Sequence, residues 1–103
     1  MKNIIVTGGS GFLGSNIVDL LIKKKFNVTV LDKKKPKHSK VKFISSNLSN
    51  INKLKKITKK IDCIYHLAGV SNINEVATIP VKTIRDNILY TNNLLEAARF
   101  PHI

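Results

Sequence analysis

The chain has 103 residues, of which 43% are hydrophobic, and a formal charge of +12 from 18 Lys and Arg against 6 Asp and Glu. This length and composition fit one small globular domain. A single cysteine excludes an internal disulfide, no apolar run is long enough to cross a bilayer, and neither a signal peptide nor a cluster of metal ligands is visible, so we expect a cytoplasmic protein without a metal or a membrane partner.

Most of the positive charge lies in three segments of the chain. Residues 23–25 are lysines that close an expected helix, where cations complement the helix dipole. Residues 33–40 read as a polar loop, and the lysines of residues 50–60 alternate with an apolar stripe. Basic residues are not interleaved with aromatic ones. We interpret the lysines as a solvated surface and expect no nucleic-acid partner, with polyanion binding as an alternative function.

The most informative segment joins a strand to a helix through closely spaced glycines. Residues 3–7 predict a strand, and residues 12–24 predict a helix with apolar positions 13, 17, 20 and 21 on one stripe. The glycines between them fit Gly-x-Gly-x-x-Gly at 9, 11 and 14, and Gly-x-x-Gly-x-x-Gly at 8, 11 and 14. The first glycine permits a tight turn, the second lets a pyrophosphate approach the backbone, and the third lets the helix pack closely on the strand. The segment therefore predicts a dinucleotide site at a helix N-terminus.

A second predicted strand, residues 27–32, ends in Asp32, which follows Gly14 at the distance expected of a ribose-binding acid. A carboxylate there accepts hydrogen bonds from both ribose hydroxyls and repels a 2′-phosphate, which favours NAD over NADP. Lys33, Lys34 and Lys35 follow directly and reduce that repulsion. The alternative interpretation of Asp32 is a turn residue that ends the strand.

The remaining elements continue the alternation of strands and helices. We expect strands over 41–45 and 62–66 and helices over 50–60 and 80–98, with Cys63 as a small buried hydrophobe in its strand. This pattern predicts an α/β fold with a parallel sheet in the order 3-2-1-4 and flanking helices. The fourth strand would lie at an open sheet edge, so we expect marginal folding or self-association.

Four segments carry a family resemblance: residues 6–14, residues 30–32, residues 64–69, and the stretch from Asn87 through residues 91–99. With them the chain resembles the N-terminal half of the NAD-dependent epimerase/dehydratase family, the extended short-chain dehydrogenase/reductases that act on nucleotide sugars. The resemblance implies an incomplete Rossmann-like fold. Residues 1–103 would be the N-terminal part of a dinucleotide-binding domain, without the catalytic and substrate-binding part.

The resemblance also implies a cofactor site. The pyrophosphate would be cradled by residues of the glycine segment, namely Gly8, Gly11, Phe12, Leu13 and Gly14. Asp32, followed by Lys33, would hold the adenosine ribose, and Asn47 and Leu48 would lie beside the adenine. The other expected cofactor contacts follow the fourth strand or lie on the last helix, namely Leu67, Ala68, Gly69 and Asn87.

Some of these residues allow a plainer interpretation. Asn47 also fits a loop residue before a helix, and Asn87 also fits an exposed helix position. His66 matches the family's histidine at the strand end, and we interpret it as a packing and backbone-positioning residue rather than a general base. Tyr90 replaces a glycine common in the family, which changes how the last helix packs.

The family's chemistry needs a tyrosine and a lysine four positions later, which lowers the tyrosine pKa. Residue 69 is glycine and residue 94 is leucine, so neither Tyr65 nor Tyr90 forms this pair, and we assign no catalytic residue. We therefore expect NAD(H) binding as the N-terminal fragment of a nucleotide-sugar epimerase/dehydratase-type oxidoreductase, inactive alone, with a nucleotide-sugar substrate only in a full-length parent. The alternative is a stand-alone, non-catalytic nucleotide-binding module.

Overall fold

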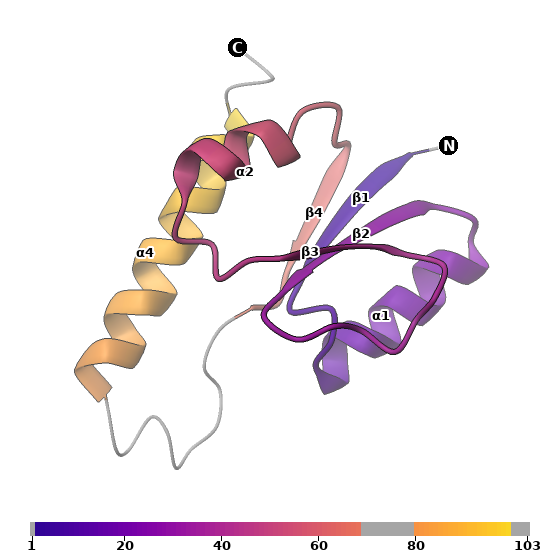
Figure 1. Ribbon diagram of the computed structural model, residues 1–103, viewed down its shortest axis with the longest axis horizontal. Coiled ribbons are helices and arrows are strands. Elements are labelled where there is room, and N and C mark those ends of the chain that lie inside the picture. The colour runs from indigo at the N-terminus through magenta and orange to yellow at the C-terminus, as the bar shows by residue number, and fades with distance from the viewer. Residues whose placement is uncertain (1, 69–79, 100–103) are drawn as a thin grey trace.

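Four parallel strands form the centre of the molecule, a computed structural model that describes residues 2–68 and 80–99 (Figure 1). In chain order the elements are β1 (Asn3–Thr7), α1 (Phe12–Lys23), β2 (Asn27–Asp32), β3 (Lys42–Ser45), α2 (Ile51–Ile57), β4 (Cys63–His66) and α4 (Pro80–Arg99). The sheet order is β3-β2-β1-β4, and every neighbouring pair is parallel. The predicted α/β class and strand order are therefore confirmed.

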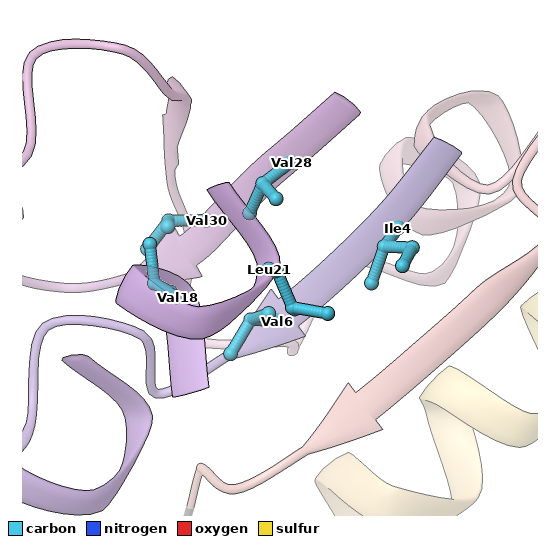
Figure 2. Packing of buried hydrophobic residues seen from close by; sticks show 6 residues of the cluster. All are labelled: Ile4, Val6, Val18, Leu21, Val28 and Val30. Atoms are coloured by element: carbon cyan, nitrogen blue, oxygen red, sulfur yellow. The ribbon is translucent and has the colours of Figure 1, made fainter. Parts of the chain in front are cut away.

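Helix α1 covers one face of the sheet. Val18 and Leu21 point from the helix onto the apolar side chains of β1 and β2, which are Ile4, Val6, Val28 and Val30 (Figure 2). The predicted stripe of α1 is only half right, because Leu13 and Leu20 are 59% and 53% exposed. The buried face of the helix consists of Gly14, Val18 and Leu21, so Leu13 and Leu20 lie on the side away from the sheet.

Helices α2 and α4 cover the opposite face and lie side by side (Figure 1). Their core is formed with alternate residues of the strands and consists of Ile5, Leu31, Leu48, Leu54, Leu94 and Ala97. The buried Thr58 hydroxyl lies 2.9 Å from the carbonyl oxygen of Leu54 and 3.3 Å from that of Ala97, so it joins the end of α2 to α4. Within the described residues, no helix combines the length and apolar character needed to cross a membrane.

Helix α2 is shorter than the predicted range 50–60. Asn50 stands before the helix as its N-cap, and its side-chain oxygen accepts the Lys53 amide at 3.1 Å. At the other end the chain leaves the helix at Thr58, and Lys60 adopts a φ of 63°, which a continuing helix does not allow. The other predicted boundaries agree with the structure to within one residue.

The expectation that Cys63 is buried is wrong, since its side chain is exposed. Cys63 pairs in register with Ile4, and Tyr65 pairs with Val6, so both point to the face that α1 covers. Helix α1 lies over β1 and β2 and does not extend over β4 (Figure 1). In the described part of the chain β4 pairs with β1 alone, and it forms the open edge that the sequence predicts.

Candidate functional site

The carboxyl ends of the parallel strands bring the predicted site residues to one edge of the sheet. Thr7 lies in register with Leu31 on one side and with His66 on the other, and Asp32 lies in register with Ser45. The glycine segment, Asp32 and the turn after β4 therefore meet at this edge, where ligands bind in open α/β sheets.

Gly8 makes the turn that leaves β1. Its φ of 72° lies in the left-handed region, and its amide donates to the Leu31 carbonyl oxygen at 2.9 Å. A Cβ at this position would come within 2.9 Å of the backbone of Leu67 and Ala68. Glycine is thus required here both by the backbone conformation and by the direct contact between two turns.

Gly14 brings the first turn of α1 against the same glycine segment. A Cβ on Gly14 would overlap the carbonyl oxygen of Gly8. The sequence interpretation placed this close approach between helix and strand, whereas the structure places it between the helix and the Gly8–Gly9 turn. Gly9 was not among the predicted site residues, yet a Cβ there would lie 2.8 Å from the Val30 side chain.

The N-terminus of α1 opens towards this edge. Gly11 is the N-cap residue, and no side chain of the described residues caps the helix. Phe12 and Leu13 follow with exposed side chains. An uncapped first turn beside a glycine backbone presents N–H groups and the positive end of the helix dipole, an arrangement that favours an anion such as a phosphate.

The Asp32 carboxylate lies beside the glycine segment. Its Oδ2 accepts the Ser10 amide at 3.0 Å, and its Oδ1 accepts the Lys33 and Lys34 amides at 2.6 and 3.4 Å. The Ser10 hydroxyl donates to the Lys34 carbonyl oxygen at 2.6 Å, which ties the two turns together a second time. Asp32 therefore organises the local turn and remains half-exposed at the site, while Lys33 and Lys34 have exposed side chains.

Asn47 and Leu48, the residues expected beside the adenine, both make contacts within the chain. The Asn47 side-chain oxygen accepts both the amide and the hydroxyl of Ser49, at 3.1 and 2.5 Å, which is the local turn that formed the alternative interpretation. Leu48 is a buried core residue, and its carbonyl oxygen accepts the Asn93 side-chain amide at 3.0 Å. Their position beside an adenine stays a prediction.

The turn after β4 is held by side chains from three elements. The Thr7 hydroxyl oxygen accepts the amides of Leu67 and Ala68 at 3.0 and 3.1 Å and lies 2.6 Å from His66 Nδ1. His66 Nε2 lies 2.8 Å from the hydroxyl of Thr91 on α4. This agrees with the interpretation of His66 as a packing and positioning residue, and burial lowers the pKa of its imidazole.

Two further predicted site residues are Gly69 and Asn87. Gly69 lies outside the described residues. Asn87 lies on α4 one helical turn before Thr91 and is half-buried. Sequence reasoning missed Thr7 and Ser10, although a polar residue at the end of the apolar run Ile4–Val6 is a signal that its hydroxyl has a buried partner.

A family model described as the NAD dependent epimerase/dehydratase family matches residues 4–102. The chain belongs to this family. Its fold is the Rossmann-like fold of the solved epimerase structures, and the resemblance expected from the sequence is confirmed.

Three similar proteins illustrate the range within the family. The chain is 37% identical over 101 residues to UDP-glucuronic acid decarboxylase 1 of Arabidopsis thaliana, and the matched region covers 93% of this chain and 23% of that protein. It is 32% identical to the UDP-N-acetylglucosamine 4-epimerase of Methanobrevibacter ruminantium in complex with UDP-N-acetylmuramic acid, with a TM-score of 0.84 and coverage of 99% and 35%. It is 26% identical to the UDP-glucose 4-epimerase of Brucella ovis in complex with NAD, with a TM-score of 0.87 and coverage of 99% and 33%. The chain thus spans about a quarter to a third of the length of these relatives.

Proposed function

We propose that this chain binds a nicotinamide dinucleotide at the carboxyl edge of its sheet, with NAD favoured over NADP. The observation that carries the proposal is the hydrogen bond from the Ser10 amide to the Asp32 carboxylate, because it puts a ribose-binding acid directly beside a phosphate-binding turn. The pyrophosphate would lie over Gly11 and the first turn of α1, which no side chain from the described ranges caps.

The close contact of Gly8 with the Leu67–Ala68 backbone supports the part of the proposed cofactor site that follows β4. The two turns border one surface at the end of β1 and β4, and small residues there let a flat cofactor approach the backbone. When bound, a nicotinamide supplies hydride transfer to and from a sugar carbon. The proposed cofactor contacts are Gly8, Gly11, Phe12, Leu13, Gly14, Asp32, Lys33, Leu67, Ala68, Gly69 and Asn87. For Asn47 and Leu48, whose side chains make contacts within the chain, an adenine contact stays a prediction.

We further propose that this chain is the N-terminal nucleotide-binding part of a nucleotide-sugar epimerase/dehydratase-type oxidoreductase of the cytoplasm. The names of its relatives support a nucleotide-sugar substrate for such a parent protein. The sequence contains no Tyr-x-x-x-Lys, so the acid–base step of the parent would depend on groups outside these 103 residues. A stand-alone binding module without catalysis is the alternative, and the same absence of a proton-transfer pair favours it.

Calorimetric titration of the 103-residue chain with NAD and with NADP tests the binding proposal. We expect saturable binding of NAD and at least about tenfold weaker binding of NADP, since a 2′-phosphate would meet the Asp32 carboxylate. Asp32→Ser should remove most of this preference, and Asp62→Ser, which changes an exposed acid at the other end of the sheet, should leave it intact.

The circular dichroism spectrum of each variant serves as the folding control. Folded chain without saturable NAD binding would reject the proposal. Equal affinity for both dinucleotides in the wild-type chain would reject the role given to Asp32 and leave dinucleotide binding standing. Turnover of a nucleotide sugar by this chain alone would contradict the assignment of the proton-transfer groups to another part of the parent.

A further inference from the structure

The Thr7 hydroxyl is a buried group with three hydrogen-bonding neighbours. It lies at the end of β1, fully enclosed, and its oxygen accepts the amides of Leu67 and Ala68. The third neighbour is His66 Nδ1, at 2.6 Å. A hydroxyl group has two lone pairs and one proton, so these three contacts use its whole hydrogen-bonding capacity.

The hydrogen-bond partners of the Thr7 hydroxyl indicate which nitrogen of the His66 imidazole carries the proton. The Leu67 amide is shared between the Thr7 hydroxyl oxygen and the Thr7 carbonyl oxygen, which lies 3.1 Å from the same nitrogen, and the Ala68 amide donates to the hydroxyl oxygen. With two amides directed at its lone pairs, the hydroxyl is left to donate its own proton to His66 Nδ1, the acceptor that the described residues place against it. That nitrogen is then an acceptor, and the ring proton sits on Nε2, which donates to the Thr91 hydroxyl at 2.8 Å. The network therefore selects a neutral imidazole in the Nε2–H form.

The turn after β4, which the Thr7 hydroxyl holds, is in direct backbone contact with the glycine turn. The Leu67–Ala68 backbone lies so close to Gly8 that a Cβ would not fit between them, and the Gly8 carbonyl oxygen in turn abuts Gly14 at the start of α1. A shift of the turn after β4 would therefore move Gly8 and the first turn of α1. Thr91 ties the same unit to α4, the helix that carries Asn87.

We propose that Thr7, His66 and Thr91 form a positioning unit in which the Nε2–H form of His66 holds the Leu67–Ala68 turn against Gly8 and so sets the geometry of the cofactor edge. This inference rests on the proposed dinucleotide function. The three residues act through the backbone of the two turns, and none of them is assigned a contact with the cofactor.

The surroundings of His66 agree with a neutral ring. Its ring nitrogens face hydroxyl groups of β1 and α4, and burial lowers its pKa. The carboxylates of α4 are paired elsewhere on that helix, Asp86 with Lys82 and Arg85 and Glu96 with Arg99. A doubly protonated ring would direct a third N–H at the Thr7 hydroxyl oxygen, which already faces the amides of Leu67 and Ala68 and has only two lone pairs.

The test compares Thr7→Val with Thr7→Ser. Valine keeps the shape of the side chain and removes the hydroxyl, whereas serine keeps the hydroxyl. We expect Thr7→Val to lower NAD affinity by about tenfold or more and to shift the amide resonances of Gly8 and Ala68, and we expect Thr7→Ser to stay within about threefold of the wild-type affinity. Unchanged Gly8 resonances and NAD affinity in Thr7→Val would overturn the positioning unit.

A second measurement decides the tautomer without any cofactor. Nitrogen-15 spectra of the wild-type chain should show His66 with a protonated Nε2 and an unprotonated Nδ1, and Thr91→Val should reduce this preference even if Thr7→Val fails to fold. An Nδ1–H form in the wild-type chain would overturn the inference. Failure of the wild-type chain to bind NAD, with the tautomer and the Gly8 shifts as expected, would instead reject the proposed function and keep the positioning unit.

Discussion

Asp32 uses most of its hydrogen-bonding capacity inside the chain. Its two oxygens accept three backbone amides, from Ser10, Lys33 and Lys34. A carboxylate has about four acceptor positions, so on the order of one remains for a ligand hydroxyl. The turn-ending role is thus compatible with a hydrogen bond to one ribose hydroxyl, whereas the sequence analysis expects bonds to both. His66 likewise has a structural role within the chain. It has no assigned chemical step, but it contacts the Thr7 hydroxyl, which accepts two backbone amides.

The lowered pKa of His66 predicts a dependence of stability on pH. The pKa lies below its ordinary value of 6.5 because burial disfavours the charged ring. Between the folded and the unfolded pKa the unfolded chain binds more protons, so the free energy of unfolding rises with pH in this window. The contribution is complete above 6.5 and is lost as pH falls through the folded pKa.

Urea unfolding between about pH 5 and 8 measures this dependence. We expect the slope of the unfolding free energy against pH to be smaller in His66→Gln than in the wild-type chain. Identical slopes in the wild-type chain and His66→Gln would show that the ring does not titrate in the way inferred.

At the scale of elements, α2 is the shortest of the three helices that the described residues form. Its seven residues are too few for a helix to persist in water without tertiary contacts. It depends on the Asn50 cap, on the fully buried Leu54 and on the bond from Thr58 towards Ala97 of α4. Helices α2 and α4 therefore stabilise each other, and we expect a change in α2 to alter the free energy of unfolding.

Asn50→Ala should lower the free energy of unfolding by about 1 kcal/mol, because it leaves the Lys53 amide without its capping acceptor. Asn52→Ala, an exposed change inside the same helix, should leave stability unchanged or raise it slightly. Chemical unfolding monitored by circular dichroism measures both variants. A loss in Asn52→Ala equal to that in Asn50→Ala would contradict the capping role.

On the scale of the whole molecule, apolar side chains remain uncovered outside the two cores. Val81, Ile88 and Leu95 recur at a spacing of seven residues on α4 and are 77%, 66% and 65% exposed. Among the described residues, the edge strand β4 also has no strand partner on its outer side. The charge of +12 opposes association through mutual repulsion. Burial of the apolar side chains favours association most when salt screens this charge.

We propose that the chain self-associates and that added salt increases the associated fraction. Ile88→Lys and Leu95→Lys should each lower this fraction, because they place a charge in the exposed apolar line of α4. Asn92→Lys adds the same charge at an exposed polar position of the same helix and should have a smaller effect. Sedimentation velocity measures the association state, and a monomeric wild-type chain at moderate salt would contradict the proposal.

Local patterns were enough to predict the strand order, the glycine turn and the place of Asp32. Each depends on residues close in the sequence, on the handedness of crossovers and on the rule that parallel strands end at one edge. The exposed Leu13 and Leu20 show the limit of this reasoning. Their apolar character marks a helix, but the neighbours that α1 meets decide which of its sides is buried.

The sequence by itself determined the class of fold and the glycine turn between β1 and α1, since these follow from periodicity and from spacing along the chain, and it determined the family through the resemblance of its motifs. Only the tertiary structure decided that Cys63 is exposed, that the Asn47 side chain closes its own turn, and that Thr7, His66 and Thr91 act together. The physical reason is distance along the chain. Thr7 and His66 are 59 residues apart and His66 and Thr91 are 25 apart, and hydrogen bonds over such separations exist only once the sheet and α4 have brought the groups together.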